Sequence, residues 1–348
     1  MVNGGPFVSV IIPCRNEENF IAGCLDSVIA NDYPAGRLEI LVVDGMSTDR
    51  TPAILSNYAK NRENLRVLNN PRKITPVSLN IGARNASGEL IMRMDAHAKI
   101  SNDYIRRCVE TSLASGADNV GGVMKTLPQS DGIFAQTVAE CLSHRFGVGG
   151  SAFRTGASRR VEVDTVFGGC YRREVFERVG YWNEDIPRSQ DIEFNRRLKR
   201  AGGRIILDPE IVSYYYVRSD PKTFLKHNWT NGVWAILPFL YCDAPPVSWR
   251  HLVPLAFISA LGAACALATV THIGTWLLCG IVAVYAAACL GASVAIAVQK
   301  KRLRLAVFSP IVFAMLHLTY GLGSVWGLIR IGVHLLCFSW RLRRNNET

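Results

Sequence analysis

Apolar runs alternate with helical patterns over the first third of the chain. The runs at residues 7–12, 38–43, 65–68 and 90–94 predict strands. Each is followed by a segment with helical spacing, at residues 17–30, 51–60, 76–86 and 102–115. Strands and helices that alternate with short connections predict an α/β domain, in which a mostly parallel sheet is covered on both faces.

The pattern changes near residue 250 to one typical of a membrane protein. Residues 252–298 contain no Lys, Arg, Asp or Glu, and another apolar stretch covers residues 305–329. A membrane span needs about 20 apolar residues, so the first run is long enough for two spans with a turn at residues 271–275. The second stretch either crosses once or folds back as a hairpin at residues 321–323. We therefore expect three or four segments within residues 251–340, followed by a basic tail at residues 341–348.

The positive charge of the chain gathers around these apolar segments. The formal net charge is +11, and from Lys300 onward eight basic residues stand against one acidic residue. A nucleic-acid-binding protein would spread this charge along a groove, so we expect no nucleic-acid partner. Basic loops remain on the cytoplasmic side of a membrane. The loop at residues 299–304 and the whole domain before residue 250 are therefore expected in the cytoplasm.

Several other functional classes are disfavoured. The ten cysteines show no CxxC pair, which indicates neither a zinc site nor a disulfide framework, and reduced thiols are expected. Neither GxGxxG nor a P-loop pattern follows the first predicted strand, which argues against a dinucleotide-dependent dehydrogenase and an NTPase. No charged leader with an apolar stretch opens the sequence, so no signal peptide is expected.

Acidic residues follow three of the predicted strands. Glu17 follows the first, Asp44 ends the second, and Asp95 and His97 follow the fourth. Ligands of parallel sheets bind where the strands end, and acids gathered there need a cation or a donor-rich ligand. Asp95 and His97, two residues apart in extended chain, point to the same side and could hold a divalent cation bound to a diphosphate. Asp49 is either a ligand or a helix cap before Thr51 and Pro52.

Six segments in a fixed order resemble family 2 glycosyltransferases of the GT-A fold. They are residues 8–17, 39–51, 80–89, 95–98, 168–173 and 190–198. Within that family the chain is similar to membrane-anchored exopolysaccharide glucosyltransferases of the succinoglycan ExoA type, over roughly residues 7–218. The resemblance implies a GT-A catalytic domain at residues 1–220. Residues 221–250, with Trp229, Trp234 and Trp249, are then expected as an amphipathic segment at the membrane surface, with core packing of the tryptophans as the alternative.

The resemblance also implies roles for individual residues on the donor side. The nucleoside pocket would be lined by Pro13, Asn16, Glu17 and Asp44, with Asp44 facing the base and Asp49 a further candidate. Asp95 and His97 stand where the family has two metal-binding carboxylates, so the expected cofactor is Mn²⁺ or Mg²⁺, and imidazole favours Mn²⁺. Arg84 either approaches the diphosphate or is a surface arginine.

Asp191 matches the catalytic base of the family. It would take the proton of the acceptor hydroxyl as that oxygen attacks the anomeric carbon, while the metal stabilises the departing nucleotide diphosphate. Such a single displacement inverts the anomeric centre. Gln190 stands where the family has an acid and would orient the acceptor by hydrogen bonding. Gly169 would let the backbone approach the sugar closely.

The implied function is the inverting, non-processive transfer of a hexose to a lipid-linked saccharide in exopolysaccharide or cell-surface glycan synthesis. The Gln-x-x-Arg-Trp motif of processive members is absent from residues 226–234. The expected donor is a UDP-sugar, taken to be UDP-glucose. Two alternatives are a polyprenyl-phosphate hexosyltransferase and a catalytically silent, nucleotide-binding membrane scaffold. The expected location is a bacterial-type inner membrane, multi-pass, with the catalytic domain cytoplasmic; the sequence predicts no oligomeric state.

Residues 132–154 lie between the donor half and the predicted base. They are rich in glycine and basic residues, among them Arg145 and Arg154. We expect this segment to form a mobile wall of the acceptor site that meets a lipid diphosphate.

Overall fold

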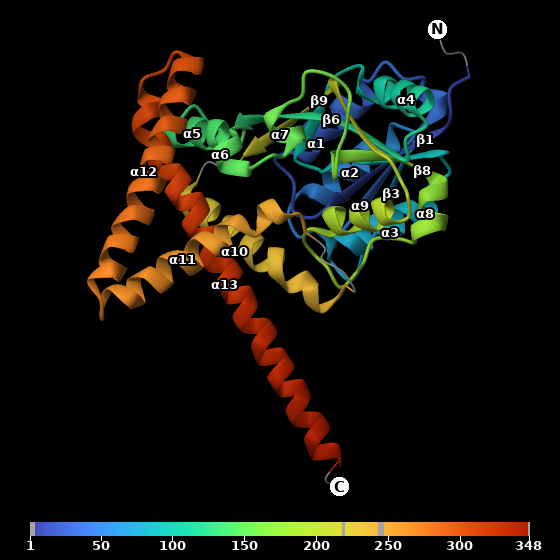
Figure 1. Ribbon diagram of the computed structural model, residues 1–348. Helices are drawn as coiled ribbons and strands as arrows, with labels where there is room; N and C mark the ends of the chain where they lie inside the picture. Colours follow the sequence, from blue (N-terminus) through green and yellow to red (C-terminus); the bar gives the residue numbers. More distant parts are fainter. Residues whose placement is uncertain (1–3, 218–219, 243–246, 347–348) are drawn as a thin grey trace. The chain divides into compact units, whose positions relative to one another are not determined.

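The chain divides into two compact units in the computed structural model, which describes residues 4–217, 220–242 and 247–346, with side chains up to residue 336 (Figure 1). Unit 1 comprises Met1–Leu127 and Ser151–Tyr216, and unit 2 comprises Pro128–Gly150 and Val217–Thr348. Unit 1 ends at Tyr216, and all later residues belong to unit 2; the sequence predicted a domain boundary at residue 220. The earlier excursion at Pro128–Gly150 has no signal in the hydrophobic pattern.

Unit 1 is built on one mixed sheet. Its strands within the described residues are β1 (Val8–Cys14), β2 (Leu38–Asp44), β3 (Leu65–Asn69), β4 (Leu90–Arg93), β5 (Ala98–Ile100), β6 (Asn119–Pro128), β7 (Val161–Glu162), β8 (Phe167–Arg172) and β9 (Ile205–Val217). The order is β3-β2-β1-β4-β8-β6-β9-β5, with β7 beside β9. The pairs among β3, β2, β1 and β4 are parallel, whereas β8 runs antiparallel to both β4 and β6. The α/β prediction is confirmed, and the parallel part is the four-strand half predicted from the hydrophobic runs.

Helices cover both faces of this sheet. They are α1 (Ile21–Ile29), α2 (Thr51–Lys60), α3 (Thr75–Asn85), α4 (Tyr104–Ser115), α7 (Ala152–Thr155), α8 (Arg173–Val179) and α9 (Gln190–Arg200), with a 3₁₀ turn at Ala35–Arg37. Successive strand residues point to opposite faces. Val10 and Ile12 accordingly pack into one core with residues of α1 and α4, whereas Ile11 packs into the other with residues of α3, α8 and α9. These last three helices lie together in Figure 1.

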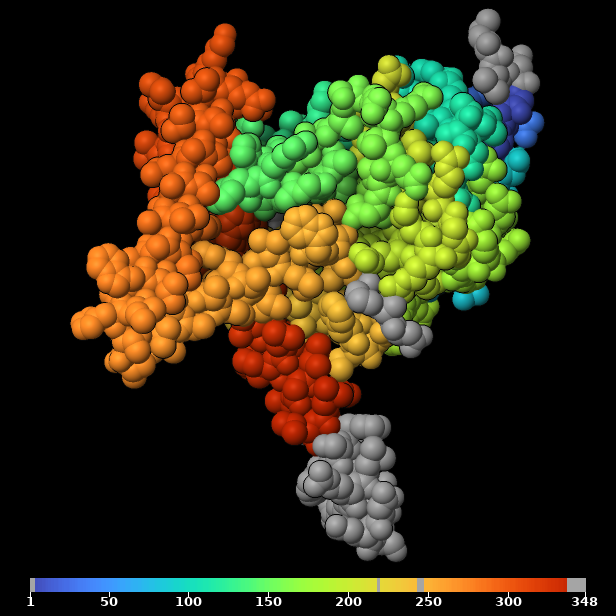
Figure 2. Space-filling view, in the orientation of Figure 1, coloured from blue at the N-terminus to red at the C-terminus, as the bar shows by residue number. Residues whose placement is uncertain are grey.

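Unit 2 consists of helices. They are α5 (Ile133–Cys141), α6 (Arg145–Val148), α10 (Pro221–Ile236), α11 (Val253–Ala268), α12 (His272–Lys300) and α13 (Arg304–Asn346), with 3₁₀ turns at Leu237–Leu240 and Trp249–His251. Within the described part of the chain, three helical segments are long and apolar enough to cross a membrane: Trp249–Ala268, His272–Lys300 and Arg304–Leu336. Apolar side chains of α11 and α12 such as Leu267, Trp276 and Val284 are exposed on the surface of the unit, whose helices α11 and α12 are orange in Figure 2. Exposed apolar surface of this extent is typical of a membrane-facing region.

The hairpin considered at residues 321–323 is not formed, because α13 continues through this segment without a break. The glycines serve helix packing instead. A Cβ atom on Gly321 would lie 2.5 Å from the carbonyl oxygen of Pro254 in α11, and one on Gly323 would lie 2.3 Å from that of Trp229 in α10. In return, a Cβ on Gly232 of α10 would lie 2.0 Å from the carbonyl oxygen of Tyr320. Small residues of this kind let helix backbones approach closely in membrane proteins.

The excursion at Pro128–Gly150 packs on α12 and α13 within unit 2. The Phe146 ring lies 5.0 Å from the rings of Phe313 and His317, and His317 Nε2 lies 2.9 Å from the Phe146 carbonyl oxygen. The expected acceptor wall at residues 132–154 is therefore divided. Its Arg145 belongs to unit 2 and is exposed, whereas Arg154 belongs to unit 1.

Candidate active site

The loops after β1 and β2 are tied together where these parallel strands end. The Asn16 backbone amide donates to Ser47 Oγ at 2.8 Å, and Asn16 Oδ1 accepts from the Thr48 amide at 2.8 Å. Ser47 Oγ donates in turn to Asp44 Oδ1 at 2.5 Å, and the Ser47 amide donates to Asp44 Oδ2 at 3.1 Å. Asn16 has a φ of 54°, a left-handed conformation that asparagine tolerates better than most residues. The structure thus brings the predicted residues Asn16 and Asp44 into one hydrogen-bonded loop pair.

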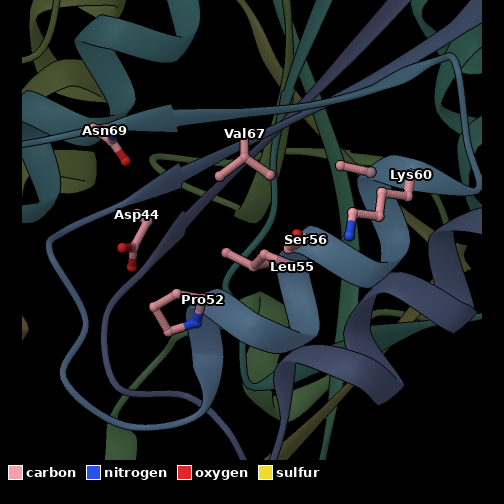
Figure 3. A pocket seen from close by; sticks show the side chains of 8 residues that line it. Asp44, Pro52, Leu55, Ser56, Lys60, Val67 and Asn69 are labelled. Carbon is pink, nitrogen blue, oxygen red and sulfur yellow. The ribbon is translucent and has the colours of Figure 1, made fainter.

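Asp44 also lines a cavity of about 430 Å³. Asp44 and Asn69 come from the ends of β2 and β3, and most of the other lining residues come from α2 (Figure 3). Leu55 and Val67 give the cavity apolar walls, whereas Lys60 and the two strand-end residues contribute polar groups. Pro13 pairs with Val43 in the neighbouring strand and is not among the lining residues. Apolar walls with a few polar groups are typical of cavities that bind small organic ligands.

Asp49 holds the loop that leads into α2. Its Oδ1 accepts from the Thr51 amide at 2.9 Å and its Oδ2 accepts from the Glu18 amide at 3.2 Å. Burial raises the pKa of Asp49, but the hydrogen bonds from Thr51 and Glu18 outweigh it and hold that pKa below its usual value. These hydrogen bonds give Asp49 a structural role at the start of α2, where Arg50 occupies the N-cap position itself.

Arg93, the last residue of β4, connects the predicted metal ligand with the predicted base. Its Nε and Nη2 donate to Asp95 Oδ1 at 3.3 Å and 3.0 Å, and its Nη1 lies 3.8 Å from Asp191 Oδ2. The Arg93 and Asp95 side chains are 12% and 20% exposed, and that of Asp191, in the first turn of α9, is 37% exposed. Burial raises the pKa of Asp95, but Arg93 and His97 together hold it below its usual value. The Arg93 guanidinium therefore lies between the Asp95 and Asp191 carboxylates and brings them close together.

His97 is oriented by Glu17. His97 Nδ1 lies 3.2 Å from Glu17 Oε1, and the ring packs edge-on against Tyr215 with 5.1 Å between centroids. Glu17, expected in the nucleoside pocket, is thus a contact of the predicted metal ligand. Metal-binding histidines commonly present one ring nitrogen to a carboxylate and the other to the metal. The Glu17 contact on Nδ1 suits metal binding through Nε2.

Asp95 and His97 fit a cation that arrives together with a diphosphate. Among the residues that the structure describes, no three His, Cys, Asp or Glu side chains gather as a self-contained metal site. A Mg²⁺-type cation is usually held by one or two protein ligands, with substrate phosphates and water completing the shell. One carboxylate and one imidazole meet that requirement for a divalent cation.

The structure places three other predicted residues, Arg84, Gly169 and Gln190, in unit 1. Arg84, in the last turn of α3, stacks on Tyr181 with 4.0 Å from its guanidinium carbon to the ring centroid. Because α3 ends before β4 begins, Arg84 lies toward the amino ends of the parallel strands and is not brought to Asp95. A Cβ on Gly169 would lie 2.4 Å from Asn119 Oδ1, so this glycine makes room for a neighbouring side chain. Gln190 is the buried first residue of α9, next to Asp191.

Sequence reasoning missed Arg93, although a signal was present. Arg93 is the single charged residue in the apolar run at residues 90–94. A charge in a buried strand needs a partner, because an unpaired buried charge is strongly unfavourable. The nearest acid in the sequence, Asp95, is that partner.

Similarity to known proteins assigns the chain to a family. The model of glycosyl transferase family 2 matches residues 9–180. The succinoglycan biosynthesis protein ExoA of Rhizobium meliloti is 30% identical over 309 residues, which cover 84% of this chain and 86% of that protein. The chain belongs to glycosyl transferase family 2. The resemblance seen in the sequence is thereby confirmed.

Two further comparisons extend the picture of this family 2 glycosyltransferase. A transferase of Methanococcus voltae, named as a dolichyl N-acetyl-α-D-glucosaminyl phosphate 3-β-D-2,3-diacetamido-2,3-dideoxy-β-D-glucuronosyltransferase, is 30% identical over 233 residues, 65% of this chain and 72% of that protein. The structure of the mannosyltransferase PcManGT from Pyrobaculum calidifontis, solved with GDP-Man and Mn²⁺, gives a TM-score of 0.59 at 21% identity, covering 94% of this chain and 88% of that one. This structural likeness confirms the GT-A fold.

Proposed function

We propose that this glycosyltransferase moves a hexose from a nucleotide diphosphate sugar to a lipid-linked saccharide, with inversion and without processivity. The observation that carries the proposal is the contact of Arg93 with both Asp95 and Asp191. It sets the residue expected to hold the donor diphosphate beside the residue expected to activate the acceptor. Reaction at one carbon between a leaving group and a nucleophile requires this proximity.

The donor would lie along the ends of β2, β1 and β4. These strands are neighbours in that order, and adjacent strands are about 4.8 Å apart. The cavity beside Asp44 suits the base, and Asp95 with His97 lies two strands further on, where the diphosphate would reach. A divalent cation, when bound there, would neutralise charge on the departing diphosphate. Glu17 would fix the His97 ring, and Arg93 would fix the Asp95 carboxylate.

Asp191 would act as the general base. Its carboxylate is partly exposed, so an acceptor hydroxyl can reach it. The acceptor oxygen forms a bond to the anomeric carbon as the bond from that carbon to the diphosphate oxygen breaks, and the hydroxyl proton passes to Asp191. Attack from the face opposite the leaving group inverts the anomeric centre. Arg93 is a positioning residue in this scheme, because it acts through the two carboxylates.

The relatives support the proposed acceptor and location. One is named for succinoglycan biosynthesis and the other for transfer to a dolichyl phosphate-linked sugar. The three apolar helical segments of unit 2 suit a multi-pass protein of a bacterial-type inner membrane with its catalytic unit in the cytoplasm. Glucose from UDP-glucose is the proposed donor group, by analogy with the succinoglycan type.

The test is release of nucleotide diphosphate by the purified full chain in lipid nanodiscs. Mn²⁺, a lipid extract from the source cells and a panel of UDP-glucose, UDP-N-acetylglucosamine and GDP-mannose are supplied. We expect release with one donor, an inverted linkage in the product by NMR, and loss of release in Asp191→Asn. Asp185→Asn, at an exposed aspartate on the same stretch of chain, is the matched control and should retain activity. Release no faster than in Asp191→Asn with every donor would refute the proposal and favour the silent scaffold.

The polyprenyl-phosphate alternative is separated by the acceptor. A phosphate oxygen needs no base to remove a proton, whereas a sugar hydroxyl does. Asp191→Asn should therefore abolish transfer to a lipid-linked saccharide. If that variant still transfers sugar to polyprenyl phosphate at the wild-type rate, the alternative is correct and the saccharide acceptor is wrong.

A further inference from the structure

Arg154, in the short helix α7 of unit 1, has a buried guanidinium nitrogen without a partner. Within the part of the chain that the structure describes, Arg154 Nη1 is shielded from solvent and makes no hydrogen bond, and no carboxylate forms an ion pair with this residue. Its guanidinium carbon lies over the rings of Phe153 and Tyr215, 5.6 Å and 5.9 Å from their centroids. Two aromatic faces attract the cation only weakly compared with an anion.

Arg154 lies beside the site described above. The Tyr215 ring that it overlies packs edge-on against His97. Asp191 acts on Arg154 electrostatically, although the two form no ion pair. Burial lowers the pKa of Arg154, and the effects of Tyr215 and Asp191 offset this only in part. The positive charge nevertheless remains, since arginine is not deprotonated in proteins. A cation without an ion-pair partner thus lies against the same Tyr215 ring as the predicted metal ligand, within electrostatic reach of the predicted base.

A buried charge without a partner is unfavourable unless a ligand supplies the opposite charge. Guanidinium groups match phosphate oxygens in geometry and donate to them in pairs. We propose that Arg154 forms a phosphate-binding subsite beside Asp191, which takes a phosphate ester that enters with the substrates. This inference rests on the proposed function and names a charged group of the substrate. The phosphate belongs either to the lipid carrier of the acceptor or to the nucleotide diphosphate of the donor.

The experiment measures equilibrium binding to the full chain in nanodiscs, with farnesyl phosphate and farnesol as one pair of probes and UDP or GDP with Mn²⁺ as the other. The variants are Arg154→Met, Arg154→Lys and the control Arg159→Met, which removes an exposed arginine five positions away. Losing hydrogen bonds between two charged groups typically weakens binding by one to two orders of magnitude. Arg154→Met should therefore weaken phosphate binding roughly ten- to hundredfold. Farnesol binding, and all binding by Arg159→Met, should not change. Arg154→Lys keeps the charge without the planar fork and should show an intermediate loss.

The two arms identify the source of the phosphate. A loss confined to farnesyl phosphate supports the lipid carrier, and a loss confined to UDP or GDP supports the donor. Unchanged binding of all phosphate probes in Arg154→Met overturns the proposal, as does an equal loss in Arg159→Met. The fold of Arg154→Met is checked by thermal unfolding, where we expect no loss because an uncompensated buried charge has been removed. If that variant does not fold, Arg154→Lys decides by the same two arms.

These outcomes are separate from those that test the proposed function. Binding of the probes requires no sugar transfer, so Arg154-dependent phosphate binding without any transfer would refute the proposed reaction and leave the subsite standing. Transfer that proceeds with phosphate binding independent of Arg154 would refute the subsite alone.

Discussion

Replacement of Arg93 with methionine should destabilise unit 1 strongly. Arg93 donates two hydrogen bonds to Asp95 Oδ1, and their side chains are only 12% and 20% exposed. Removing one partner of a buried ion pair costs about 3–5 kcal/mol, because the other charge remains in a poorly solvated place. Asp95 retains some contact with solvent, so we expect about 3 kcal/mol, the lower end of that range. Methionine has similar length and keeps the apolar packing of β4, which isolates the electrostatic effect.

The cysteines of unit 1 provide the assay. Cys14, Cys24, Cys108 and Cys170 are all buried, so a thiol-reactive fluorophore labels them only when the unit opens. For a unit of this size each kcal/mol shifts the unfolding midpoint by about 2–4 °C, and Arg93→Met should therefore unfold roughly 6–12 °C below the wild type. Mass spectrometry of labelled peptides then assigns the transition to unit 1. A chelator removes metal ions, so that no bound cation can neutralise the Asp95 carboxylate in place of the Arg93 guanidinium.

A double-mutant cycle tests the cause. Asp95→Asn removes the stranded charge, and the double variant Arg93→Met/Asp95→Asn should be more stable than Arg93→Met alone, since neither charge remains unpaired. Two results would contradict the reasoning. One is an Arg93→Met midpoint indistinguishable from that of the wild type. The other is a double variant whose loss equals the sum of the two single losses, because that would show no coupling between the pair.

Three other substitutions are informative. Glu17→Gln should weaken Mn²⁺ binding in the presence of UDP about ten- to hundredfold by calorimetry, with the adjacent Glu18→Gln as an unaffected control; equal affinities would show that Glu17 does not orient a metal ligand. Gly232→Ala should lower the unfolding temperature of unit 2, because its Cβ would lie 2.0 Å from a carbonyl oxygen of α13, whereas Gly262→Ala, with nothing within 4 Å, should not. Asp208 is a buried residue of β9 that accepts hydrogen bonds from the Glu210 amide, the Thr111 hydroxyl and the Arg160 guanidinium. Burial raises the pKa of Asp208, but these hydrogen bonds hold it below its usual value. Its contribution to stability is therefore complete above the unfolded pKa of about 3.9 and is lost as the pH falls further. Thermal unfolding of Asp208→Asn should therefore differ most from that of the wild type near pH 7 and converge with it below about pH 4; a constant difference would refute this assignment.

Local periodicity was sufficient to predict the parallel half of the sheet. The helix expected at residues 51–60 is α2 with the same bounds, and the strand expected at residues 38–43 is β2 with one residue added. These elements are predictable because their apolar spacing reflects burial against immediate neighbours. The glycines at residues 321 and 323 were ambiguous because small size serves a tight turn and a close helix crossing equally. Only the presence of α10 and α11 beside α13 distinguishes the two.

The excursion at Pro128–Gly150 shows a different limit. Its helices are short, and what places them is contact with residues far along the chain, such as Phe146 with Phe313. No periodic pattern encodes a contact over that separation. The same holds for the site, where the resemblance predicted Asp95 and Asp191 but not the guanidinium that contacts both. The charge of Arg93 in an apolar run indicated that a partner existed, whereas the second partner, Asp191, comes from a distant helix.

The two arginines near Asp191 give opposite expectations for the same substitution. Arg93 is paired with carboxylates of the protein, so Arg93→Met strands a charge and should lower the unfolding temperature of unit 1. Arg154 has a buried nitrogen without a partner, so Arg154→Met removes an unfavourable charge and should leave that temperature unchanged or raise it. Phosphate binding should respond in Arg154→Met, where a direct donor is lost. The unfolding temperature measured without ligand thus distinguishes an arginine that stabilises the folded site from one whose charge is balanced only when a ligand binds. If Arg154→Met were as destabilising as Arg93→Met, Arg154 would have a structural role, and its unpaired nitrogen would no longer indicate a subsite.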